Sequence, residues 1–235
     1  MRLTNEKPHS CPDGRRIHIS PLKAEFSNTA HREFGAPYFL PSGSMRTAQK
    51  EKPMNRFAER IRVGLEDAEM LANIDQAQLD AMAQAIMDAK RVYIAGWGRA
   101  GNCVKILAMD CSQMGMEAHI CGDNTTPSIH EGDILIIGSG SGTTKTMVIL
   151  AEEAKEHGAK LGLISGNAES TIGKMADYNI EIKRLPKRNG ETEDTLSGGT
   201  FYHVMLQTVD ILRMYICDEK GLTLKDIVYN HNNLE

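Results

Sequence analysis

The chain has 235 residues, of which 41% are hydrophobic and 25% charged, and its formal net charge is −4 at pH 7. These values exclude a wholly disordered chain, and no apolar run approaches the roughly 18 residues of a membrane helix. Because the net charge creates no overall basic field, we expect neither nucleic acid nor a membrane as a partner.

The first 53 residues differ in composition from the rest. They carry nine Lys/Arg against five Asp/Glu, and proline, glycine and polar residues recur there without a helical or alternating period. We therefore expect an N-terminal extension with little stable structure, residues 1–53, and one folded domain, residues 54–235. Its acidic residues argue against an RNA-binding arm or a transit peptide, whereas an upstream start codon, with Met45 or Met54 as alternative starts, accounts for the extension simply.

The cysteines indicate the compartment. They form an odd set without CxxC spacing, which is typical of reduced thiols rather than of a disulfide framework: Cys11, Cys103, Cys111, Cys121 and Cys217. The N-terminus also lacks the apolar segment of a signal peptide. Both observations favour a cytoplasmic protein.

The predicted elements begin with two helices. Apolar residues recur at helical intervals over 56–74, and Asp75 is placed to cap a second helix over 77–90. Short apolar runs rich in β-branched residues then predict five strands, at 91–96, 117–122, 133–140, 160–166 and 177–182. Helices are predicted between and after them, at 101–115, 143–158 and 199–219.

The strands alternate with helices and are apolar almost throughout. That pattern is typical of a parallel sheet covered on both faces, in a three-layer α/β/α sandwich. Ligands of such sheets bind beyond the carboxyl ends of the strands. The residues that follow each predicted strand are therefore the candidates for function.

A glycine- and hydroxyl-rich loop follows the strand at 133–140 and opens into a helix. The free N–H groups and the dipole of a helix N-terminus favour an anion, and glycines allow close approach of the backbone. Because Lys145 follows Thr144, the loop lacks the lysine spacing of a nucleotide P-loop, and a monophosphate fits better than a triphosphate. An ordinary Ser/Gly turn is the structural alternative. The candidate phosphate ligands are Ser139, Gly140, Ser141, Thr143 and Thr144.

The loop after the first strand, residues 96–102, has the form GxGxxG, which a dinucleotide site requires. The acidic residue that would bind the ribose fits only loosely, because Glu117 opens the next strand and Asp123 lies just past it. The alternative is that this loop faces a sugar phosphate at the same sheet edge as residues 139–144, the serine loop. The candidates there are Gly98, Arg99 and Asn102.

These two loops in this order resemble the sugar isomerase (SIS) family of phosphosugar-binding domains. The resemblance extends over residues 54–235. Within the family, the chain is similar in particular to the 6-phospho-3-hexuloisomerases. It rests on IAGWGRAG, the Asn-Thr-Thr-Pro stretch at 124–127, EGDILIIGSGSGTTKT, the Gly-Thr-Phe segment at 199–201, and the C-terminal His-Asn-Asn-Leu-Glu at 231–235.

The resemblance implies a flavodoxin-like five-stranded parallel sheet, a homotetramer, and interconversion of a 3-hexulose 6-phosphate with fructose 6-phosphate. It implies no metal and no organic cofactor. The chemistry moves a proton between adjacent carbons through an enediol, which needs a general base, an oxyanion donor and a water-shielded site.

The sequence departs from the family pattern at three positions. Thr143 stands where the family has a glutamate, Ala100 where it has a serine, and His203 where it has the glutamate taken as catalytic base. A histidine can still abstract and return a proton, so we interpret His203 as the candidate base. A histidine satisfied in the core or at an interface is the alternative.

The C-terminal tail supplies two further candidates. If the tail reaches a neighbouring subunit, His231 could protonate the sugar oxygens and Glu235 could act as a carboxylate, although terminal residues are normally frayed. The leading hypothesis is thus a phosphosugar isomerase with catalytic candidates His203, His231 and Glu235. A phosphosugar sensor without turnover and an isomerase of another sugar phosphate are the alternatives.

Overall fold

The computed structural model describes residues 56–186 and 200–234. The expected N-terminal extension, residues 1–53, lies outside the described residues. Within the described ranges, no helix is both long and apolar enough to cross a bilayer.

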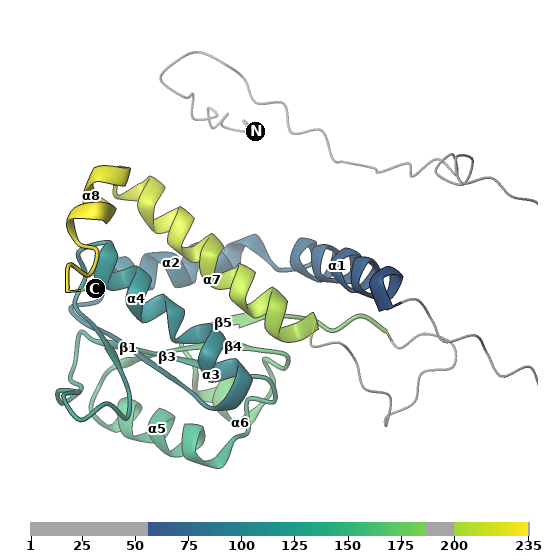
Figure 1. Ribbon diagram of the computed structural model, residues 1–235. Helices are drawn as coiled ribbons and strands as arrows, with labels where there is room; N and C mark the ends of the chain where they lie inside the picture. Colours follow the sequence, from purple (N-terminus) through teal and green to yellow (C-terminus); the bar gives the residue numbers. More distant parts are fainter. Residues whose placement is uncertain (1–55, 187–199, 235) are drawn as a thin grey trace, which may run out of the picture. The chain divides into compact units, whose positions relative to one another are not determined.

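The described chain is built around one five-stranded parallel sheet (Figure 1). The strands are Val92–Gly96 (β1), Ala118–Ile120 (β2), Ile134–Ser139 (β3), Lys160–Ser165 (β4) and Tyr178–Glu181 (β5). Their order is β2-β1-β3-β4-β5, the order of flavodoxin-like folds. This confirms the predicted parallel sheet and places each strand where the apolar runs predicted it.

Helices cover both faces of the sheet, as the three-layer prediction requires (Figure 1). One face carries α2 (Gln76–Asp88), α3 (Gly98–Val104), α4 (Ile106–Gln113) and α7 (Thr200–Glu219). The other carries α5 (Lys145–Glu156) and α6 (Thr171–Met175). Two more helices pack on the outside, α1 (Arg56–Ala72) against α7 and α8 (Leu224–Tyr229) against α4.

Four of the predicted helices, at 56–74, 77–90, 143–158 and 199–219, correspond to α1, α2, α5 and α7. The predicted continuous helix at 101–115 was wrong, because α3 already begins at Gly98 and the chain turns at Lys105 before α4. The short helices α6 and α8 were not predicted. Asp75 does cap α2, accepting the N–H of Ala77 at 2.9 Å.

The three central strands β1, β3 and β4 contribute to two separate cores because their side chains alternate between the faces. In β3, Ile134 and Ile136 pack with α2, α3, α4 and α7. Leu135 and Ile137 pack under α5 and α6. All four are nearly fully buried, which explains why the strand reads as a continuous apolar run.

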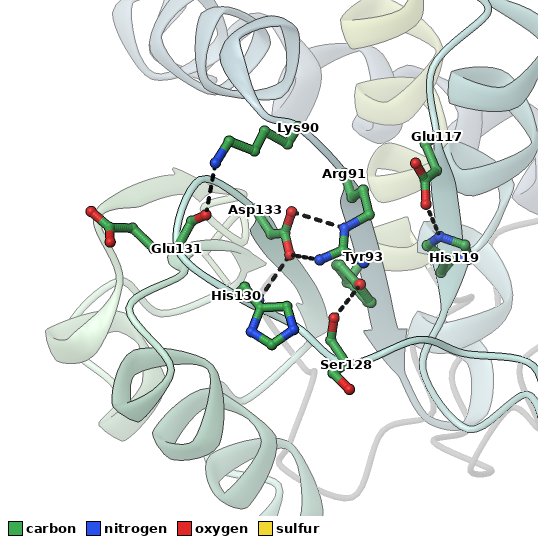
Figure 2. A network of polar contacts seen from close by, with 9 residues as sticks. All are labelled: Lys90, Arg91, Tyr93, Glu117, His119, Ser128, His130, Glu131 and Asp133. Carbon is green, nitrogen blue, oxygen red and sulfur yellow. Dashed lines mark hydrogen bonds and ion pairs between the residues drawn. The ribbon is translucent and has the colours of Figure 1, made fainter.

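The connection from β2 to β3 crosses β1 as an irregular segment, which the structure describes throughout. The hydroxyl of Tyr93 donates to the carbonyl of Ser128 at 2.9 Å. The buried Asp133 accepts two hydrogen bonds from Arg91, at 3.1 and 2.7 Å, and the N–H of His130 at 2.8 Å (Figure 2). This network stabilises the segment at the amino ends of β1 and β3.

The two edges of the sheet are blunted in different ways. The edge strand β2 has three residues, all half-buried. At the other edge, the N–H of Glu181 in β5 donates to the side-chain oxygen of Gln78 in α2 at 2.9 Å. The helix therefore supplies a partner to a backbone group that a further strand would otherwise bind.

Asp177 makes the stability of the fold pH-dependent. Burial alone would raise the pKa of Asp177, but the ammonium of Lys155 at 2.8 and 3.0 Å, the N–H of Leu161 at 2.8 Å and the charge of Lys160 lower this pKa below its ordinary value. The ionised form is thus favoured by folding, and this stabilisation is present above about pH 4 and lost as the pH falls through the lowered pKa.

We therefore expect the free energy of unfolding of the wild-type chain to fall as the pH decreases below about 4, and to fall less steeply in Asp177→Asn. Urea unfolding followed by circular dichroism at a series of pH values measures both slopes. Equal slopes in the two proteins would show that Asp177 is not responsible.

Candidate active site

The candidate site lies where the order of strands reverses. From β1 the chain proceeds to the β2 side of the sheet, and from β3 it proceeds to the β4 side, so the loops after β1 and β3 diverge at the carboxyl edge, where open α/β sheets bind their ligands. Gly96 and Gly138 are paired in register at this edge. The two glycine-rich loops predicted to bind phosphate therefore lie next to each other.

The loop after β3 is ordered by its own hydroxyl groups. Ser139 is buried, and its Oγ accepts the N–H of Gly142 at 3.1 Å and lies 3.3 Å from the Oγ1 of Thr144. The exposed Ser141 accepts the N–H of Thr143 at 3.2 Å and its hydroxyl at 3.1 Å. The loop is thus folded into a hydroxyl-lined turn at the start of α5, whose first N–H groups have no partners within the helix.

The unpredicted helix α6 supports this turn from behind. Gly142 adopts a φ of +65°, and a Cβ at this position would lie 2.0 Å from the Oγ of Ser170. Ser170 is the N-cap of α6, where it accepts the N–H of Gly173 at 3.1 Å, and the N–H of Ile172 donates to the carbonyl of Gly142 at 3.1 Å. Only glycine fits at position 142.

The GxGxxG pattern after β1 serves close packing. A Cβ on Gly101 would lie 2.3 Å from the carbonyl oxygen of Gly96, so the pair brings α3 directly onto the end of β1. Glu117, one candidate for binding a ribose, lies at the opposite, amino edge of the sheet and contacts His119 at 3.1 Å (Figure 2). This geometry explains two of the three glycines without a dinucleotide.

The first turns of α3 and α7 meet at this edge of the sheet. The exposed Arg99 stacks on the ring of Tyr202, with 4.1 Å between the guanidinium carbon and the ring centre. A Cβ on Gly140 would lie 3.8 Å from the Tyr202 hydroxyl, so this ring spans from the first loop to the serine loop. Burial raises the pKa of Cys103, and the positive charge of Arg99 offsets only part of this rise. The Cys103 thiol donates to the carbonyl of Tyr202 at 3.4 Å.

Of the other residues in the first loop, Gly98 is exposed with a φ of +58° and Asn102 is exposed on α3. Ala100 is buried, where the resemblance expects a serine. The structure thus brings Gly98, Arg99 and Asn102 to the same sheet edge as the serine loop. Tyr202 and Ser170 were missed by sequence reasoning, since an aromatic residue in a helix and a serine in a loop carry no motif of their own.

His203 follows Tyr202 in the first turn of α7, so its backbone lies at the same end of the sheet as the serine loop. Its Nδ1 lies 3.0 Å from the Oδ2 of Asp67, which is on α1 and 136 positions earlier in the chain. The side chain of His203 is 54% exposed and that of Asp67 only 9%. Asp67 was also missed, because nothing in the sequence pairs two residues so far apart.

The C-terminal tail lies at the other end of the molecule. The side chain of Asn230 donates to the carbonyl of Gln113 at 3.2 Å, at the end of α4 that leads into β2. His231 is exposed beside it. Since α7 has 20 residues and spans about 30 Å, His231 is not brought together with the serine loop of the same chain (Figure 1). Glu235 lies outside the described residues.

The chain is similar to known proteins of one family. Residues 85–208 match the family described as SIS domain. The chain is 36% identical to a 3-hexulose-6-phosphate isomerase of Bacillus subtilis (strain 168), over 70% of this chain and 90% of that protein. It is 31% identical to a 3-hexulose-6-phosphate isomerase of Mycobacterium gastri, over 72% and 86% of the two chains.

A solved structure agrees with these relatives. The crystal structure of a hypothetical protein from Methanococcus jannaschii, described as inferring a molecular function of 3-hexulose-6-phosphate isomerase, superimposes with a TM-score of 0.67 at 26% identity. The superposition covers 75% of this chain and 99% of the other. The chain therefore belongs to the SIS domain family, and within that family to the subfamily of the 3-hexulose-6-phosphate isomerases.

Proposed function

We propose that the protein is a phosphosugar isomerase that interconverts a 3-hexulose 6-phosphate and fructose 6-phosphate by proton transfer through an enediol. The observation that carries this proposal is the preformed turn from Ser139 to Thr144. This turn lies at the carboxyl edge where the order of the strands reverses, and at the N-terminus of α5. The relatives named 3-hexulose-6-phosphate isomerase support the choice of sugar.

The phosphate group would be bound without a metal ion. The hydroxyl groups of Ser139, Ser141, Thr143 and Thr144 and the N–H groups opening α5 are donors that suit a phosphate dianion. Arg99, held by its stacking on Tyr202, adds a positive charge beside the same turn. Binding the phosphate in this way fixes the sugar chain relative to the base, which converts proton transfer into an oriented intramolecular step.

His203 is the proposed base. It would take the proton from one carbon of the sugar and return it to the neighbouring carbon, while an acid gives a proton to the carbonyl oxygen and regains one from the hydroxyl that becomes the new carbonyl. His231 and Glu235 are candidates for that acid only from a second copy of the chain, because His231 lies at the far end of its own molecule.

The test is isotope exchange. With 3-hexulose 6-phosphate or fructose 6-phosphate in deuterated water, we expect NMR to show interconversion of the two sugars and deuterium at the carbon that loses the proton. Incorporation without a second sugar would identify another isomerisation product. No incorporation by the full chain would contradict the proposed activity.

A second candidate is a phosphosugar sensor that binds its ligand without turnover. It is favoured by the departures from the family pattern at Ala100, Thr143 and His203. An isomerase of another sugar phosphate is favoured by the same positions. Stabilisation against heat by fructose 6-phosphate without deuterium exchange is the result that the sensor predicts, and exchange into a different sugar phosphate is the result that the third candidate predicts.

Replacing Ser141 with alanine is expected to weaken phosphosugar binding under all three candidates. Hydrogen bonds to a charged group contribute about 1.5–3 kcal/mol, so Kd or KM should rise by roughly tenfold to hundredfold. Titration calorimetry with fructose 6-phosphate measures the change. Ser112→Ala, which removes an exposed hydroxyl from α4 near the opposite sheet edge, is the matched control. Equal affinities of Ser141→Ala and wild type would remove Ser141 from the phosphate site.

We also propose that residues 54–235 are the functional domain and that the protein acts as a homotetramer in the cytoplasm. Exposed apolar side chains on three helices support association between copies, among them Leu65, Met214 and Val228. A chain starting at Met54 is expected to retain assembly and turnover, as measured by light scattering and the isotope assay. Loss of either would contradict the proposed boundary.

A further inference from the structure

The contact between Asp67 and His203 joins two groups of opposite character. Asp67 is almost fully buried between α1 and α7, whereas half of the His203 side chain is exposed. The Oδ2 of Asp67 lies 3.0 Å from Nδ1 of His203. The other oxygen, Oδ1, is buried and has no hydrogen-bond partner among the residues that the structure describes.

This contact determines which imidazole nitrogen carries the proton. An ionised carboxylate can only accept hydrogen bonds, so Nδ1 must be the donor. In a neutral imidazole with the proton on Nδ1, the other nitrogen, Nε2, has a free lone pair and can act as a base. Asp67 thus selects the tautomer in which the nitrogen facing away from α1 is able to accept a proton.

The same contact also acts after the proton has moved. When Nε2 takes a proton from the substrate, the ring becomes an imidazolium with a positive charge. A carboxylate lies 3.0 Å away and is largely shielded from water. It therefore stabilises that charge more than the same carboxylate would if both groups were surrounded by water. The interaction is therefore stronger in the protonated intermediate than in the resting state, which is the condition for an effect on kcat.

We propose that Asp67 is a positioning residue of the active site, which holds His203 in the Nδ1–H tautomer and stabilises its protonated form. The proposal rests on the proposed function, in which His203 is the base. The family pattern has a glutamate at the base position, and a carboxylate base needs no partner to select a tautomer. A histidine at position 203 does need one, and Asp67 supplies it from α1.

A second buried aspartate provides a matched control. Asp110 on α4 is also nearly fully buried, contacts a side chain of α7 through one oxygen, Arg213 at 3.5 Å, and leaves its other oxygen without a partner among the described residues. Burial raises its pKa. Asp110→Asn therefore reproduces the loss of a buried carboxylate against α7 at a place far along the helix from His203.

The experiment compares Asp67→Asn with Asp110→Asn in the full-length chain. The asparagine keeps the size of the side chain, but its amide can donate to Nδ1 and so favours the proton on Nε2. We expect kcat of Asp67→Asn in the isotope assay to fall about hundredfold or more, with KM changed less than about threefold. Asp67→Glu, which restores an accepting carboxylate, should recover part of kcat. Asp110→Asn should keep kcat within about threefold of wild type.

The tautomer is measured directly by 15N NMR of histidine-labelled protein, at a pH that keeps imidazoles neutral. The His203 signal is assigned by its loss in His203→Gln. We expect the proton on Nδ1 in wild type and in Asp110→Asn, and a shift toward Nε2 in Asp67→Asn. This readout requires no turnover.

Three results would overturn the proposal. The first is a wild-type His203 with its proton on Nε2, and the second is an Asp67→Asn protein that is folded and keeps kcat. The third is a wild-type chain that exchanges no deuterium with any sugar phosphate, in which case the proposed function fails and the positioning role fails with it. The first two results leave the proposed isomerase activity intact, so the two failures are distinguishable.

Discussion

Replacing His203 with glutamine is expected to lower kcat for sugar phosphate interconversion by about 10²–10⁴-fold, the range for loss of a general base. Glutamine has a similar length and stays polar, so the first turn of α7 and the stacked pair of Arg99 and Tyr202 should keep their places. In the proposed function, phosphate binding depends on the serine loop and not on His203. The KM for the phosphosugar should therefore change much less than kcat.

The measurement is steady-state turnover together with deuterium incorporation, since a lost base abolishes both. His157→Gln is the control, because it removes an exposed histidine at the end of α5 and should leave kcat unchanged. Thermal unfolding of both variants separates lost catalysis from lost folding. Turnover at the wild-type rate in His203→Gln would exclude His203 as the base and leave its contact with Asp67 as a link between α1 and α7.

Replacing Gly101 with alanine is expected to have the largest effect on the fold. The added Cβ would lie 2.3 Å from the carbonyl oxygen and 2.5 Å from the carbonyl carbon of Gly96, and backbone atoms cannot turn aside as a flexible side chain can. The helix α3 would have to move away from β1, and it carries Gly98, Arg99 and Asn102. Overpacking of this kind costs about 3 kcal/mol, or roughly 6–12 °C in Tm for a domain of this size.

Gly64→Ala is the matched control for this substitution. Gly64 is also a helical glycine, in α1, but a Cβ there has nothing within 4 Å. Alanine should stabilise the helix by about 0.5–1 kcal/mol. Calorimetry of the two variants should thus show shifts of opposite sign. A Gly101→Ala protein as stable as wild type would mean that α3 can shift without cost, and the role of Gly96 and Gly101 in close packing would be wrong.

The sequence predicted those parts of the fold that depend on local pattern. The strands were found because buried parallel strands are apolar throughout, and the serine loop because glycines and hydroxyls precede a helix at a strand end. The helix α6 has only five residues, too few for a periodic pattern to appear. The interruption at Lys105 leaves no proline or glycine signal at that position, so α3 and α4 were predicted as one helix.

The candidate site was predictable only where its residues lie close in sequence. The roles of Tyr202 and Asp67 depend on the packing of α7 against α3 and α1, which unites residues about 100 positions apart or more. The location of His231 depends on the direction in which α7 runs. Tertiary packing sets both, and neither propensity nor spacing reports it.

The blunted edges of the sheet decide how copies of this chain can associate. A three-residue β2 offers too few backbone groups for a strand of another molecule, and at β5 the amide of Glu181 is already occupied by Gln78. Edge-to-edge growth of the sheet, the route by which native β proteins aggregate, is therefore disfavoured at both ends. Any contact between copies of the chain is left to the faces of helices, where it can close into a finite assembly instead of extending without limit.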